Sequence, residues 1–206
     1  MLELRKRIRD RRHRLLLALA RHGNEDAFRQ LYRELYRPVA LYIRRRTQNR
    51  EDAEDLCSEV FRKFLVGLDR FDPSRGSVMG WVVAMAHNTL IDEYRRRGPP
   101  PQEFDSMSGP LAGALPDVRP GPLRVLIGRE EMDSVRDALA RQPSEIREMF
   151  SLRFEQDMRV REVAAVMGIS PDAAKQRFAR ALRTLREDLA ERKTSRRGEE
   201  SCESTD

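Results

Sequence analysis

A proline-rich segment divides the chain into two parts. Seven of the eleven prolines among the 206 residues fall within residues 98–123, in the stretches GPPPQ, GP, LPD and RPGP. Proline has no amide hydrogen to donate and fixes its own φ angle, so this segment cannot sustain a helix, and it offers few bulky apolar side chains to a core. We therefore predict a flexible linker over 98–123 with a folded domain on each side of it.

Helical periodicity dominates the part that precedes the linker, and no stretch alternates convincingly as a strand. Apolar residues recur at steps of three and four from residue 14 to 46, and His22-Gly23-Asn24 marks a turn between two helices. Asn24 suits the N-cap position, because its side-chain oxygen can accept hydrogen bonds from the first helical turn. A further helix is predicted over 51–68, where the acidic start EDAED suits the positive end of the helix dipole.

A turn-rich loop and another apolar helix complete this first domain. The loop is FDPSRGS, residues 71–77, with one proline and one glycine. Ser77 is placed to cap a helix over 78–97, whose cationic last turn complements the helix dipole. Residues 14–97 are thus predicted to form one helical domain and residues 124–193 a second, which makes the fold all-α with two small domains.

The second domain contains the pattern of a helix-turn-helix in REVAAVMGISPDAAKQRF, residues 161–178. Gly168 can take the left-handed conformation that ends the first helix, Ser170 can cap the second, and Pro171 suits its first position. One side of this second helix is apolar, and the side facing away from it is basic or small. The residues of that basic face and its flanks are Ala173, Lys175, Gln176, Arg177, Ala179, Arg180 and Arg183.

Such a basic face fits the major groove of DNA, where arginine can pair with guanine and glutamine with adenine. Lys175 lies nearer the apolar side and is expected to meet a phosphate instead. The alternative is an ordinary solvated helix with scattered arginines. The glycine turn, the cap and the basic face together favour binding to DNA.

The charge of the chain points to an anionic partner. Forty lysines and arginines against 34 aspartates and glutamates give a net charge of +6, which favours nucleic acid before a membrane surface. Eight basic and two acidic residues lie within residues 1–22. Residues 1–13 are therefore predicted to form a basic N-terminal arm, which either touches DNA phosphates or is solvated and flexible. The tail, residues 194–206, has the polar composition of disorder.

Several classes of protein lack support in the sequence. Cys57 and Cys202 form neither a disulfide framework nor a metal-binding spacing, and the three histidines are scattered. There is no phosphate-binding glycine loop and no credible Ser-His-Asp set. No run approaches the roughly 18 apolar residues of a membrane-spanning helix. We expect a cytoplasmic protein without catalytic residues, cofactor, metal site or membrane insertion.

Motifs in both domains resemble the extracytoplasmic-function (ECF) group of bacterial RNA polymerase sigma factors. The first domain contains EDAEDLCSEVFRKF followed by LDRFDPSRGSVMGWVVAMAHNTLIDEYRRR, and the second contains ALARQPSEIREMFSLRFEQDMRVREVAAVMGIS before the basic helix. The resemblance covers residues 14–190, with the linker where the family has one. It implies an alternative sigma factor that binds core RNA polymerase and directs promoter recognition, DNA melting and transcription initiation.

The resemblance also implies roles for residues of the first domain, sigma region 2. The helix over 51–68 would dock on the clamp coiled coil of the largest polymerase subunit. The residues assigned to docking are Asp55, Leu56, Glu59 and Phe61. A solvated acidic helix with a buried stripe explains Leu56 and Phe61 equally well.

The loop 70–77 and the helix 78–97 would open the minus-ten element and hold its non-template strand. The residues assigned to this role are Arg75, Asn88, Asp92, Arg95 and Arg96. Asn88 can hydrogen-bond the edge of an unstacked base, and the arginines can follow the backbone. Asn88 and Asp92 could instead pair with each other across one helical turn. Trp81 on the same helix is expected to pack in the core rather than stack on a base.

The second domain, sigma region 4, would bind the minus-thirty-five element through the basic face described above. The implied partners are core RNA polymerase, double-stranded and melted promoter DNA, and an anti-sigma factor, with the protein a monomer outside the holoenzyme. The alternative is a free-standing helix-turn-helix regulator whose first domain binds a ligand or a second copy. Such regulators normally dimerise to reach successive major grooves, and this chain shows no clear dimerisation heptad.

Overall fold

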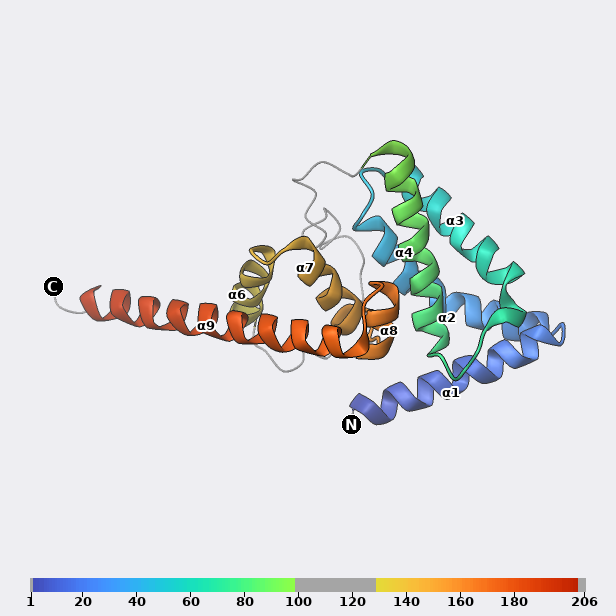
Figure 1. The fold of residues 1–206 in the computed structure, drawn as a ribbon, viewed down its shortest axis with the longest axis horizontal. Coiled ribbons are helices and arrows are strands. Elements are labelled where there is room, and N and C mark those ends of the chain that lie inside the picture. Colours follow the sequence, from blue (N-terminus) through green and yellow to red (C-terminus); the bar gives the residue numbers. More distant parts are fainter. Residues whose placement is uncertain (1, 99–128, 204–206) are drawn as a thin grey trace.

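The computed structural model describes residues 2–98 and 129–203, and within these ranges every regular element is a helix, which confirms the all-α fold (Figure 1). Apart from Gly98, the predicted linker lies outside the described residues. The first domain consists of α1 (Leu2–Arg21), α2 (Glu25–Arg44), α3 (Arg50–Val66), a 3-10 turn η1 (Leu68–Arg70) and α4 (Val78–Arg97). The second consists of α6 (Arg129–Ala140), α7 (Ser144–Phe150), a π-helical turn η2 (Ser151–Glu155), α8 (Val160–Val166) and α9 (Pro171–Glu203).

Polar side chains fix where the helices of the first domain begin. The Asn24 side chain accepts from the amide three residues on at 2.9 Å, and the Ser77 hydroxyl does the same at 3.0 Å, as the sequence predicts. α3 begins slightly earlier than expected, because Asn49 caps it by accepting from the amide of Asp52 at 2.7 Å. These caps satisfy amide groups that have no partner inside their own helices.

The core of the first domain lies where α2, α3 and α4 meet. Val39, Phe64 and Val82, one from each of these helices, are fully buried. The Phe64 ring belongs to an aromatic cluster, with centroids 6.2 Å from Phe61 and 5.7 Å from Trp81. The half-buried Trp81 packs against this core, as the sequence analysis expects.

α1 replaces the predicted N-terminal arm, because it is helical without a break from Leu2 to Arg21 and packs along α2. Its inner face buries Leu17 and His13. The His13 Nε2 atom lies 3.1 Å from a carboxylate oxygen of Glu34 on α2. Burial lowers the pKa of His13 in spite of that carboxylate. The basic residues of 2–13 therefore sit on a packed helix, which composition alone could not indicate.

α9 is longer than the sequence predicts. The polar composition of residues 194–206 predicts disorder, but the helix continues to Glu203 and extends away from the rest of the protein (Figure 1). Residues 194–203 contain no proline, and their one glycine, Gly198, weakens a helix without ending it. Because no local signal stops the helix at 194, it continues beyond the second domain.

A buried ionic cluster joins the two domains. Glu148 of α7 lies 2.6 Å from the guanidinium of Arg46, just beyond α2, and accepts from the Tyr42 hydroxyl at 2.5 Å. That hydroxyl has only one proton, so His87 Nδ1, 3.0 Å away, donates to its oxygen. Burial acts to raise the pKa of Glu148, but the charge of Arg46 and these hydrogen bonds lower it to about 2. The carboxylate therefore stays ionised and paired across the domain boundary.

Candidate nucleic-acid and polymerase interfaces

The start of α9 has the geometry of a helix-turn-helix recognition helix. Gly168 has a φ of +66°, the left-handed conformation that lets the chain turn after α8. The Ser170 hydroxyl accepts from the amide three residues on at 3.1 Å, and Pro171 is the first residue of α9. Ala174 and Phe178 are buried on its inner side. The local signals in the sequence therefore predicted this turn correctly.

Three polar side chains on the outer side of α9 have no partner within the described residues. They are Gln176, Arg180 and Arg183, which are exposed. Their spacing of four and three residues places them on one helical face. Together with Ala179 they line an open depression in the surface. This face presents hydrogen-bond donors to solvent without an internal acceptor.

The other residues predicted for this interface are engaged within the second domain. Lys175 lies 3.0 Å from Asp172 in an exposed ion pair, which is weak enough for a phosphate to displace. Arg177 is paired with Glu145 at the start of α7. Ala173 is half-buried. The depression is thus lined by only part of the predicted set.

Four of the five residues predicted to hold the minus-ten strand, all except Arg75, lie on the exposed side of α4. Asn88 is exposed, and its side chain makes no hydrogen bond within the described residues. Asp92 lies 3.6 Å from Arg95, and Arg96 lies 2.6 Å from Glu93. The alternative pairing of Asn88 with Asp92 is therefore not found, and the Asn88 amide is available to a ligand.

The loop 71–77 has its own internal bonds. The Asp72 carboxylate accepts from the Ser74 amide at 2.8 Å, and hydrogen bonds from Ser74 hold the pKa of Asp72 below its usual value. Arg75 is 88% exposed and lies 3.5 Å from Asp72. The loop thus presents a cationic side chain to solvent on a turn fixed by an aspartate.

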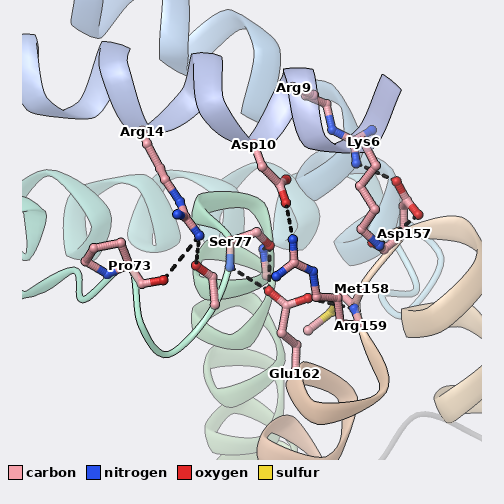
Figure 2. A network of polar contacts seen from close by, with 12 residues as sticks. Lys6, Arg9, Asp10, Arg14, Pro73, Ser77, Asp157, Met158, Arg159 and Glu162 are labelled. Atoms are coloured by element: carbon pink, nitrogen blue, oxygen red, sulfur yellow. Dashed lines mark hydrogen bonds and ion pairs between the residues drawn. The ribbon is translucent and has the colours of Figure 1, made fainter. Parts of the chain in front are cut away.

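Two arginines of α1 hold this loop in place, and the sequence analysis missed them. Arg14 donates to the carbonyl oxygens of Pro73 and Gly76, both at 3.2 Å (Figure 2). Arg21 donates to the carbonyl oxygen of Leu68 at 2.8 Å, where the chain enters the loop region. The partners are between 47 and 62 residues apart in sequence, so no local pattern could have revealed these bonds. α1 therefore positions the loop.

The predicted docking helix, α3, presents carboxylates but not the predicted apolar side chains. Asp55 is exposed and Glu59 is half-exposed. A hydrogen bond from Arg62 holds the pKa of Glu59 below its usual value. Leu56 and Phe61 are only 8% and 6% exposed. Their side chains pack into the core, so they support the helix. The exposed side of α3 offers the carboxylates of Asp55 and Glu59 for docking, and its C-terminal end also exposes Leu65 and Val66.

Neither a metal site nor a membrane span emerges from the part of the chain that the structure describes. Within residues 2–98 and 129–203, His, Cys, Asp and Glu side chains form no group of three or more that could hold a metal ion. No helix there is both long and apolar enough to cross a bilayer. Burial raises the pKa of the Cys57 thiol to about 11, which makes it a core side chain rather than a reactive one.

Comparisons with known proteins agree with this architecture. The family model for sigma-70 region 2 matches residues 31–99, and that for sigma-70, region 4 matches residues 132–185. The RNA polymerase sigma factor CnrH of Cupriavidus metallidurans is 30% identical over 171 residues, 82% of this chain and 89% of that one. The ECF RNA polymerase sigma factor RpoE of Cereibacter sphaeroides is 29% identical over 176 residues, 85% of this chain and 93% of that one.

Solved structures show the same fold. CnrH in complex with the cytosolic domain of CnrY matches with a TM-score of 0.55 and 27% identity, over 87% of this chain and 97% of CnrH. Two helical domains of these types, the second with a helix-turn-helix, define a sigma factor of the sigma-70 class. The chain belongs to the ECF group of this family. It is an alternative sigma factor that functions with RNA polymerase in transcription initiation, and sigma factors are regulators of transcription rather than enzymes.

Proposed function

We propose that this sigma factor contacts promoter DNA with the exposed sides of α4 and α9, and core RNA polymerase with the exposed side of α3. The observation that carries the proposal is the outer face of α9. There Gln176, Arg180 and Arg183 have no partner among the described residues, while the inner face is packed into the helix-turn-helix. Unpaired guanidinium and amide groups on an exposed helix are the donors that base edges and phosphates accept.

The face of α9 fits the minus-thirty-five duplex. Arg180 and Arg183 can donate to guanine edges or to phosphates, and Gln176 can donate to and accept from adenine. Lys175 can reach a phosphate because its pair with Asp172 is exposed. The contacts that specify sequence would therefore come from three residues, and the lysine would position the helix on the backbone.

The exposed side of α4 fits a melted minus-ten strand. Asn88 has a free amide to hydrogen-bond an unstacked base, and Arg95 has only an exposed ion pair with Asp92 that a phosphate can displace. The Arg96 guanidinium is itself exposed, although its partner Glu93 is half-buried. Arg75 at the tip of the loop supplies a further cation. Trp81 supports the helix from within rather than stacking on a base.

The proposed docking on polymerase rests on the carboxylates of α3. Neutralising Asp55 and Glu59 together, as Asp55→Asn and Glu59→Gln, is expected to weaken binding to core RNA polymerase about tenfold, since about 1.4 kcal/mol of charge complementarity would be removed. The measurement is surface plasmon resonance with sigma-free core enzyme. The matched control is Glu25→Gln with Asp26→Asn, which removes two exposed carboxylates from α2. Equal affinities of the two double variants would contradict the docking role of α3.

We also propose that an anti-sigma factor binds this protein, which is otherwise a cytoplasmic monomer outside the holoenzyme. The support is the relative CnrH, 27% identical in its solved structure, which was obtained in complex with the cytosolic domain of CnrY. A partner of this kind would cover surfaces that the polymerase needs.

A further inference from the structure

Glu162 of α8 binds Ser77, the N-cap residue of the helix that would hold the minus-ten strand (Figure 2). Its Oε1 atom accepts from the Ser77 amide at 2.6 Å and from the Ser77 hydroxyl at 2.7 Å, while Oε2 accepts from the Arg159 amide at 2.6 Å. The side chain is 5% exposed. A buried carboxylate of the second domain thus lies against the positive end of α4 in the first, where its charge is favoured by the helix dipole.

Two glycines make room for this carboxylate. A Cβ atom added at Gly76 or at Gly80 would lie 2.8 Å from Glu162 Oε1, closer than real side chains approach. Both glycines have ordinary negative φ angles, so their backbone conformation does not require glycine. Glycine is therefore needed at these positions because it leaves room for the Glu162 carboxylate. Any larger residue at either position would push the carboxylate away from Ser77.

A second set of ion pairs joins α1 to the turn before α8 (Figure 2). Asp157 is paired with Lys6, and its Oδ2 atom lies 2.6 Å from the Arg9 guanidinium. Arg159 lies 3.0 Å from Asp10. Asp157 has a φ of +55°, a left-handed conformation that is unfavourable for a residue other than glycine. Such a conformation persists only where surrounding contacts offset its cost. The ion pairs of Asp157 with Lys6 and Arg9 provide these contacts, and Lys6 is buried in the contact between the two domains.

This closed arrangement cannot be the one that binds a promoter. The minus-ten and minus-thirty-five elements lie about 25 base pairs apart, roughly 85 Å of duplex at about 3.4 Å per base pair. The residues from Glu162 to Arg183 are mostly helical, at about 1.5 Å per residue, so the proposed DNA-binding face lies within roughly 40 Å of Glu162. With Glu162 in contact with Ser77, the two domains cannot lie on both elements at once. Promoter binding by both domains therefore requires this contact to break.

We propose that Glu162, together with the contacts of α1 to Asp157 and Arg159, is an autoinhibitory latch that holds the free sigma factor closed. The latch holds the end of the loop 71–77, whose start is already fixed by α1, and it covers the first turn of α4. Binding to core RNA polymerase opens it by separating the domains. The inference rests on the proposed function, because it assumes that α4 and α9 bind the two promoter elements.

The test uses zero-length carbodiimide cross-linking of the full-length protein. The reagent activates a carboxylate and the Lys6 amine attacks it, so that an amide joins Lys6 to Asp157, the reagent taking up the water that is released. Mass spectrometry measures the yield of the 6–157 cross-link against that of Lys175 with Asp172, which lie 3.0 Å apart within one helix. In the free protein the 6–157 cross-link should form, and saturating core RNA polymerase should reduce its yield at least tenfold.

Two variants separate the latch from the general stability of the fold. Gly80→Ala displaces Glu162 yet removes a helix-weakening glycine from α4, and Glu162→Gln removes the charge but keeps the size. Both should lower the 6–157 yield at least threefold, whereas Glu187→Gln on the exposed side of α9 should leave it unchanged.

An unchanged yield in both variants, or an undiminished cross-link in the holoenzyme, would overturn the latch. Failure to bind core enzyme at all would count against the proposed function, and the free-protein yields would still decide the latch.

Discussion

Replacing Arg180 and Arg183 together by alanine is expected to weaken binding to the minus-thirty-five element at least thirtyfold. Both guanidinium groups are exposed on one face of α9 and have no partner among the described residues. Removing an arginine that binds a base costs about 1–3 kcal/mol, so removing both costs about 2–6 kcal/mol. Alanine is a good helix former, and neither side chain supports the core, so the fold should not suffer. The measurement is the affinity of the holoenzyme for a promoter fragment with an intact upstream element.

The control for this result removes the same charge elsewhere. Arg29→Ala with Arg33→Ala takes two exposed arginines from α2, and only the general attraction to DNA should fall. The affinity of the Arg180→Ala, Arg183→Ala variant for core RNA polymerase should equal that of the wild type. If this variant failed to bind core enzyme as well, the assignment of DNA and polymerase contacts to separate helices would be refuted.

Phe64→Ala is expected to destabilise the first domain by about 3–5 kcal/mol, which lowers the melting temperature of a domain of this size by about 12–40 °C. The Phe64 ring is fully buried between α2 and α4 and packs against Phe61 and Trp81. Its removal leaves a cavity beneath the docking helix. Trp81 is the only tryptophan in the chain, so its fluorescence during denaturation reports on this domain.

The neighbouring residue supplies the control for this cavity. Leu65 follows Phe64 on α3 but is 52% exposed. Leu65→Ala should therefore change the free energy of unfolding by less than about 1 kcal/mol. Similar destabilisation by Leu65→Ala and Phe64→Ala would mean that α3 does not pack as described, and the acidic docking surface would have no structural basis.

Local signals in the sequence predicted the helices and their starts. Asn24, Ser77 and Ser170 cap the helices that they were expected to cap, and Gly168 has the left-handed conformation that its turn requires. A cap or a turn depends on residues within four positions of one another, so one short stretch contains all the necessary information.

The failures concern contacts between distant parts of the chain. The bonds of Arg14 to the loop, of Glu162 to Ser77 and of Glu148 to Arg46 join residues between 59 and 102 positions apart. The docking role of Leu56 came from the resemblance, whereas the structure shows the alternative, a side chain on a buried stripe. Composition suggested a flexible arm where α1 packs along α2. Charge and hydrophobicity indicate which environment a side chain favours, whereas the tertiary structure determines which distant residues it contacts.

The measurement that tests the central claim most directly is run-off transcription from pooled genomic templates with sigma-free bacterial core RNA polymerase. The account predicts that adding this protein produces discrete new transcripts, whose start sites share sequence elements near minus ten and minus thirty-five. The start sites found in this way also identify a promoter fragment for the binding experiments above. The contrary result is that core enzyme gains no initiation while the protein alone protects specific DNA. The chain would then act as a free-standing helix-turn-helix regulator.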